Sequence, residues 1–170
     1  MKGIATSGDR MVSIPQKGPP LPLARSLNTT DEIAHNVALA IEQAATGELV
    51  EAEQLLAIQV ARLLRHAGRG GAVPAELREL VCSFALDLAR RTASVPWLDW
   101  VIELHLITDA PLSPKLLAAL QLSRNLLDRA DGLLLDQYIE TMQQRHRSLS
   151  DDDLELVSHL RELRGPTSRR

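Results

Sequence analysis

The stretch from Ser94 to Thr108, SVPWLDWVIELHLIT, constrains the fold more than any other part of the chain. At helical spacing its apolar side chains cover two surfaces, made by Trp97, Trp100, Val101, Leu104 and Ile107, and by Leu98, Ile102 and Leu106. Asp99 and Glu103 mark a narrow solvated stripe, with His105 beside the apolar surfaces. Because a helix that is apolar on most sides is normally flanked on most sides, we expect this to be the central helix of the fold.

The chain predicts an all-α protein. Apolar residues recur with the helical period from residue 31 to 165, and no segment alternates with a period of two. Aromatic residues make up only 2% of the chain, so the core must consist mainly of Leu, Ala, Val and Ile, which suits helix packing better than sheet packing. We therefore expect a single all-α domain over 31–165 with about seven helices.

Short breaks suggest that these helices form antiparallel hairpins. Thr46-Gly47, Ala93-Ser94 and Asp131-Gly132 would join three pairs, and the seventh helix would cover the end of the array. The capping signals expected at the helix starts are Thr30, Ser94, Ser113 and Ser150. The alternative to a hairpin array is an irregular helical bundle.

The two ends of the chain differ from this pattern. Residues 1–30 contain four prolines, four basic residues and a single acid, a composition typical of a disordered tail. A targeting or docking role for its GPPLPL segment, as a polyproline II ligand, is the alternative. Residues 166–170 follow Gly165-Pro166 and are expected to fray.

One hairpin carries a family resemblance. The segment ATGELVEAEQLLA, residues 45–57, resembles the turn and second-helix start of a tetratricopeptide repeat, with Gly47 in the turn and Ala52 where two helices approach closely. The resemblance covers about residues 33–64, and Asp131-Gly132 before LLLDQYIETM is a looser echo. It implies stacked hairpins with a concave face for a peptide or protein partner.

These features favour a non-enzymatic protein–protein interaction module, such as an adaptor, scaffold or chaperone. The Leu, Ala and Arg bias and the lack of cysteine pairs suit a bacterial, cytoplasmic protein. Within this class, the resemblance includes chaperones of bacterial type III secretion systems, which often look like tetratricopeptide arrays. The expected partner-binding residues are Trp97, Trp100, Val101 and Leu104, and the expected partner is another protein, a peptide or a second copy of the chain. A helical regulator of transcription is the alternative function.

The sequence carries only weak signals of catalytic or metal-binding sites. The five histidines, His35, His66, His105, His146 and His159, lack the spacing of a metal site, so we expect no metal, no cofactor and no catalytic residue. The lone Cys82 lies beside an apolar helix face and is expected to be a buried, inert thiol. No run approaches the roughly 18 apolar residues of a membrane span.

Charge also argues against nucleic-acid binding. The chain has a net charge of −3, and its best candidate recognition helix, 113–129, carries few basic residues.

Near the glycine-rich segment 68–71, Arg62, Arg65 and Arg69 admit two interpretations. They complement the negative end of a helix, which we favour, or they hold an anion.

Overall fold

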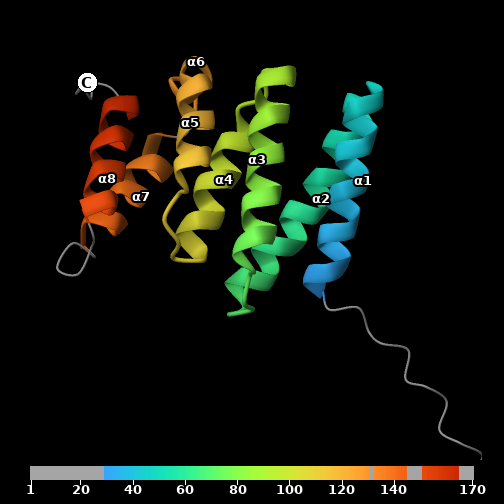
Figure 1. Cartoon of the computed structure of the whole chain (residues 1–170), viewed down its shortest axis with the longest axis horizontal. Helices are drawn as coiled ribbons and strands as arrows, with labels where there is room; N and C mark the ends of the chain where they lie inside the picture. Colours follow the sequence, from blue (N-terminus) through green and yellow to red (C-terminus); the bar gives the residue numbers. More distant parts are fainter. Residues whose placement is uncertain (1–28, 131, 145–150, 165–170) are drawn as a thin grey trace, which may run out of the picture.

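A computed structural model describes residues 29–130, 132–144 and 151–164 (Figure 1). This part of the chain contains eight helices and no strand, which confirms the all-α prediction. The helices are α1 (Thr29–Thr46), α2 (Leu49–Gly68), α3 (Ala75–Thr92), α4 (Pro96–Ile107), α5 (Pro114–Leu122), α6 (Arg124–Leu127), α7 (Gly132–Gln144) and α8 (Asp151–Arg164).

The helices form two layers. In Figure 1 the helices α1, α3, α5 and α8 stand side by side in front, and α2, α4 and α7 lie behind them. The α1–α2 and α3–α4 pairs are antiparallel hairpins, as predicted. The third pair differs from the prediction, because α7 packs chiefly against α4 and α8 rather than against α5.

The α1–α2 hairpin turns at Gly47, where φ is +95°. This left-handed conformation strains any residue with a Cβ, so glycine suits the position. Ala52 is fully buried, as are Ala40 and Ala44 on α1, and these small side chains suit close packing of the two helices. At the other end of α1, the helix begins at Thr29 and Thr30 is buried inside it, so the predicted cap at Thr30 is wrong. Residues 1–28 lie outside the described residues.

Helix α4 is central, as predicted: it packs against α2, α3 and α7. Its start differs from the prediction, since Val95 holds the N-cap position and Ser94 does not cap the helix. The backbone of Ser94 instead helps to end α3, because Ala93 adopts a left-handed conformation and the Ser94 N–H donates to the Ala89 carbonyl.

The predicted helix over 113–129 is two helices, which accounts for the eighth helix. Ser113 caps α5 as predicted, and its Oγ accepts from the Leu116 N–H at 3.2 Å. The break falls at Ser123, which is fully buried and donates its hydroxyl proton to the Ala119 carbonyl at 3.0 Å. Such a bond to the preceding turn favours a bend, and α6 then runs for four residues. The predicted cap at Ser150 and the fraying of 166–170 lie outside the described residues.

Candidate functional site

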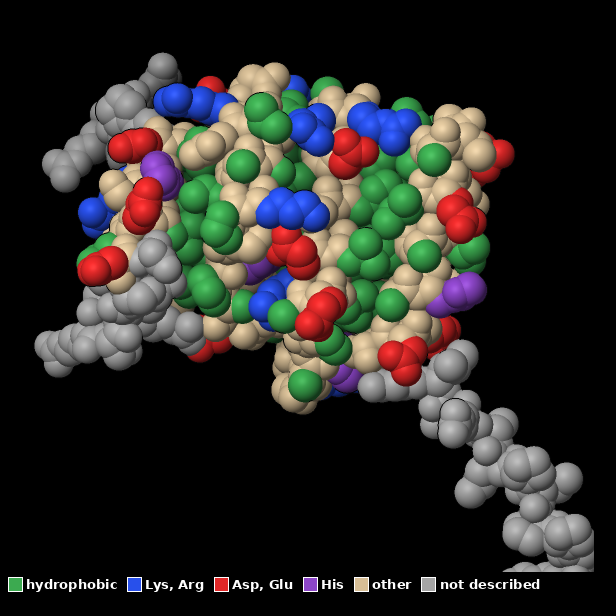
Figure 2. All heavy atoms as spheres, viewed as in Figure 1, with side chains coloured by type: hydrophobic (Ala, Val, Ile, Leu, Met, Phe, Trp, Pro, Cys, Tyr) green, Lys and Arg blue, Asp and Glu red, His purple; other side chains and the backbone are tan. Residues whose placement is uncertain are grey.

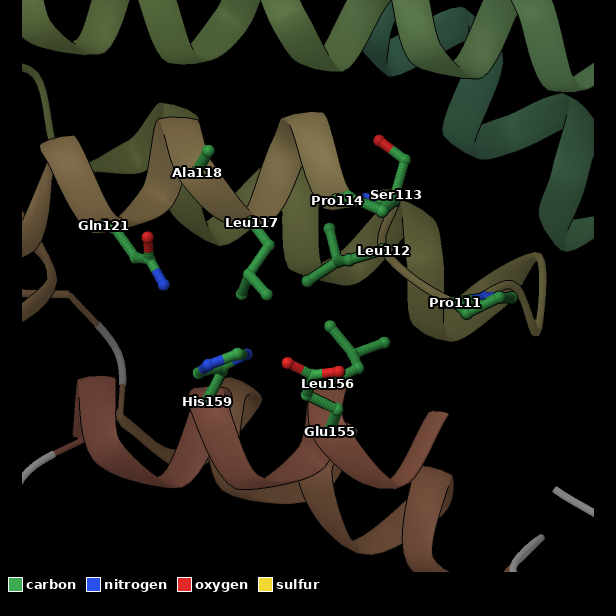
Figure 3. A pocket seen from close by; sticks show the side chains of 10 residues that line it. All are labelled: Pro111, Leu112, Ser113, Pro114, Leu117, Ala118, Gln121, Glu155, Leu156 and His159. Carbon is green, nitrogen blue, oxygen red and sulfur yellow. The ribbon is translucent and has the colours of Figure 1, made fainter. Parts of the chain in front are cut away.

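A groove between α5 and α8 has a volume of about 630 Å³. In Figure 3, Leu117 of α5, Leu112 of the preceding loop and Leu156 of α8 point toward one another across the gap. The complete lining is Pro111, Leu112, Ser113, Pro114, Leu117, Ala118, Gln121, Glu155, Leu156 and His159. The interior of the groove is therefore apolar, and its long sides belong to two helices of the front layer.

Polar side chains form the rim of this groove. Glu155 and His159 lie one turn apart on α8, and Gln121 faces them from α5 (Figure 3). A carboxylate, an imidazole and an amide together offer both hydrogen-bond donors and acceptors. An apolar interior with a few polar groups at its edge is the usual make-up of a binding site, in which the apolar part supplies affinity and the polar part orientation.

The loop that forms one end of the groove is held from behind. The Tyr138 hydroxyl of α7 accepts from the Leu112 N–H at 2.8 Å and donates to the Ala110 carbonyl at 3.3 Å. The Ser113 hydroxyl donates to the Glu79 carboxylate of α3, with its nearer oxygen at 2.8 Å. The loop is thereby fixed to two helices, so this end of the groove is preformed.

The surface of this layer carries further apolar area. Figure 2 shows apolar side chains gathered near the gap between α5 and α8, and a second group over α1 and α3. We take the α5–α8 groove as the candidate site because it is hollowed as well as apolar.

The structure does not bring the four predicted partner-binding residues to this site. Trp97, Val101 and Leu104 are buried in the core, and Trp100 is half-buried, with its ring edge-on to that of Trp97 at 4.8 Å between centroids. Trp97 Nε1 donates to the Glu53 carboxylate at 2.9 Å, which ties α4 to α2. Of the four, only Trp100 is open to contact with a partner in the folded protein.

Sequence reasoning missed the groove because its residues resemble ordinary core positions. Leu117 is one of several leucines in the predicted helix 113–129, and Leu156 lies in the last predicted helix without any distinguishing neighbour. The hydrophobic pattern of each helix does not determine the distance between α5 and α8. The sequence therefore gives no signal that a groove separates them.

Two titratable side chains in the core are buried. Burial raises the pKa of the Cys82 thiol to about 12, which makes it the inert thiol that was predicted. Burial also lowers the pKa of His105, whose Nδ1 lies 2.8 Å from the Val101 carbonyl. Since a carbonyl can only accept, Nδ1 carries the proton of a neutral ring.

A second, polar pocket lies at the far end of the array. It has a volume of about 440 Å³ and is lined by Thr29, Arg62, Arg65, His66, Arg69 and Gly71.

Within the described ranges, no group of three or more His, Cys, Asp or Glu side chains is placed to hold a metal ion. Likewise, none of the helices described is both long and apolar enough to cross a membrane.

Comparison of the chain with protein-family models, with curated proteins and with solved structures finds no match. The structure itself defines the general class. Over the described residues the chain is an all-helical, two-layer protein built largely of helical hairpins, with an apolar groove in the front layer.

Proposed function

We propose that this protein is a non-enzymatic protein–protein interaction module whose α5–α8 groove receives an apolar peptide segment of its partner. The observation that carries the proposal is the groove itself, which Leu112, Leu117 and Leu156 line in a loop and two helices. These leucines are each less than a tenth exposed, so a partner side chain must enter the groove to reach them. At protein interfaces a few side chains seated in well-packed pockets carry most of the binding energy.

The rim favours a particular kind of segment. Glu155 supplies a negative charge at the edge of the groove, so a basic residue flanking the apolar anchors of the partner would complement it. The groove also lies in the layer that contains α1 and α3, the first helices of the two hairpins, and helical-repeat proteins bind their ligands on extended surfaces formed by such layers. An adaptor, scaffold or chaperone is the role that fits such a site.

The narrower role rests on the sequence resemblance alone. Tetratricopeptide-like arrays include chaperones of bacterial type III secretion systems, so a bacterial, cytoplasmic chaperone of a secreted protein is the particular role we propose within this class. The same proposal holds that the protein carries no catalytic residue, cofactor or metal and that it does not bind nucleic acid.

The test blocks the groove without disturbing the core. Ala118 is exposed on α5 and lines the groove, so A118W places an indole in the recess, whereas A38W places one on the exposed surface of α1. Peptides are selected from a random display library on the full chain, and the Kd of an enriched peptide is measured by fluorescence anisotropy. We expect apolar peptides with a basic flank, at least tenfold weaker binding to A118W, and unchanged binding to A38W.

Two outcomes would contradict the proposal. One is equal peptide affinity for A118W and the unsubstituted chain while both remain folded by circular dichroism. The other is the failure of any peptide to enrich on the chain when it does enrich on a known peptide-binding domain handled in parallel.

A further inference from the structure

The polar pocket at the α1–α2 end of the array brings together basic side chains from the end of α2. Arg62, Arg65 and His66 lie on one face of the last two turns of α2, at spacings of three and four residues, and Arg69 directly follows the helix as its C-cap residue. They share the pocket with Thr29, the first residue of α1, and with Gly71 of the loop that follows α2. The pocket is thus walled by two helix ends and a loop.

The loop is folded tightly against this face. The Gly71 N–H donates to the His66 carbonyl at 2.9 Å, and the His66 Nε2 lies 3.2 Å from the Ala72 carbonyl oxygen. A Cβ added at Gly71 would lie 2.3 Å from His66 Nε2, so only glycine permits this approach. The imidazole is therefore held in a fixed position at the wall of the pocket.

One of the three arginines is already neutralised. Arg62 donates to both carboxylate oxygens of Glu32 on α1, at 2.8 and 3.1 Å, and also to the Gln59 side chain. The hydrogen bond from Arg62, together with its charge, lowers the pKa of Glu32, so this carboxyl stays ionised and the pair stays intact. Arg62 therefore joins α1 to α2 and shapes the pocket.

The other two arginines have no such compensation. Arg65 and Arg69 are exposed, and within the described ranges neither forms an ion pair with an acid. The end of α2 does not need them as caps either, because the His66 and Ala67 carbonyls accept from backbone N–H groups of residues 69–71. Between the two interpretations open from the sequence, this geometry favours the anion site over a mere complement to the helix end.

We propose that this pocket binds a phosphate group, with Arg65 and Arg69 as its charged ligands and His66 as a fixed wall beside them. A guanidinium presents paired N–H donors that match two oxygens of a phosphate, and two guanidiniums can engage the group from different sides. The pocket is larger than a single phosphate, which leaves room for the organic part of a phosphomonoester. The proposal is independent of the α5–α8 groove, which lies at the opposite end of the array (Figure 1).

The experiment is a titration of the full ¹⁵N-labelled chain, followed by amide chemical shifts at constant ionic strength. The probes are inorganic phosphate and glycerol 3-phosphate, with chloride as the reference anion. We expect saturable shifts at Thr29 and residues 65–72 with both phosphate probes and none with chloride. Tighter binding of glycerol 3-phosphate would identify a phosphomonoester as the ligand, and equal or weaker binding would identify free phosphate.

Two doubly substituted chains decide whether the arginines are responsible. R65A/R69A removes the two exposed charges of the pocket, and R129A/R161A removes two exposed arginines near the other end of the array. We expect at least tenfold weaker phosphate binding for the first and less than a twofold change for the second. If phosphate binding weakens equally in both variants, the loss of net positive charge explains the effect and the proposal is overturned. Phosphate-induced chemical-shift changes that lie outside residues 65–72 would also overturn it.

Discussion

The two halves of the array are built from the same kind of element, yet one is closed and the other open. Helices α1 to α4 are 18, 20, 18 and 12 residues long, and their hairpins are tied together by polar contacts. The Glu53 carboxylate of α2 accepts from Trp97 Nε1 and from the Thr92 hydroxyl, both at 2.9 Å, and the Arg91 guanidinium donates to the Ala44 carbonyl at 2.8 Å. These contacts join the first hairpin to the second.

The half formed by α5 to α8 is looser. Its first helix has nine residues and stops at Ser123, and α8 stands across a groove from it rather than against it along its full length. The difference shows how a hairpin array can acquire a binding site: long helices joined by polar contacts pack closely in one half, whereas an interrupted helix and a wider spacing leave leucines lining a recess in the other. Stability is expected to depend mostly on the first half and ligand binding in the groove on the second.

The largest effect should come from the contact that closes the first half. Trp97→Ala removes a buried indole and its bond to Glu53, and should lower the free energy of unfolding by about 3–5 kcal/mol. Trp100→Ala should cost less because Trp100 is half-buried. Urea denaturation followed by circular dichroism measures both. Unchanged stability of the Trp97→Ala variant would show that the closed half does not depend on this contact.

A smaller effect should come from the loop at the end of the groove. Tyr138→Phe keeps the ring but leaves the buried Leu112 N–H without its acceptor, which should lower the free energy of unfolding by about 1–3 kcal/mol. Peptide affinity for the groove should fall as well, because the loop is no longer fixed to α7. Thr141→Val on the same helix removes a hydroxyl that bonds only within α7 and serves as the control. If both variants bind peptide equally well, the groove does not rely on this anchor.

The smallest effect should be on the pH dependence of stability. The pKa of His105 is lowered from its ordinary value of 6.5 chiefly by burial and to a smaller extent by the charge of Arg78, and the hydrogen bond to the Val101 carbonyl and the charge of Glu79 only partly offset this. Below pH about 6.5 the unfolded chain therefore binds this proton more readily than the folded chain, and stability falls as the pH falls. The slope that this single group adds is at most about 1.4 kcal/mol per pH unit.

Substitution of the histidine isolates this effect. His105→Gln should flatten the fall in stability between pH 6.5 and 5, whereas His35→Gln, on the exposed surface of α1, should leave it unchanged. Thermal or urea unfolding over this pH range is the measurement. If the slope of stability against pH is unchanged in the His105→Gln variant, titratable groups other than His105 cause the loss of stability in acid.

The features that the sequence predicted correctly are local. The helical period, the Gly47 turn, the Ser113 cap and the burial of Cys82 each depend on a few neighbouring residues. The central position of α4 also follows from its own composition, because a helix that is apolar on most sides needs neighbours on most sides. The predicted cap at Ser94 was wrong because only two residues separate Ala93, which ends α3, from Pro96, which begins α4, and the backbone of Ser94 bonds to the helix that ends.

Only the tertiary structure decided where a ligand can reach the protein. The sequence placed Trp97, Val101 and Leu104 on a candidate binding surface, and the packing of α2, α3 and α7 around α4 buried them. The groove between α5 and α8 and the Glu32–Arg62 pair, thirty residues apart, depend on the spacing of elements distant in the chain. An apolar helix face has the same periodicity whether a neighbour covers it or leaves it open, so the pattern fixes which faces are apolar, and the three-dimensional packing alone fixes which of them remain accessible.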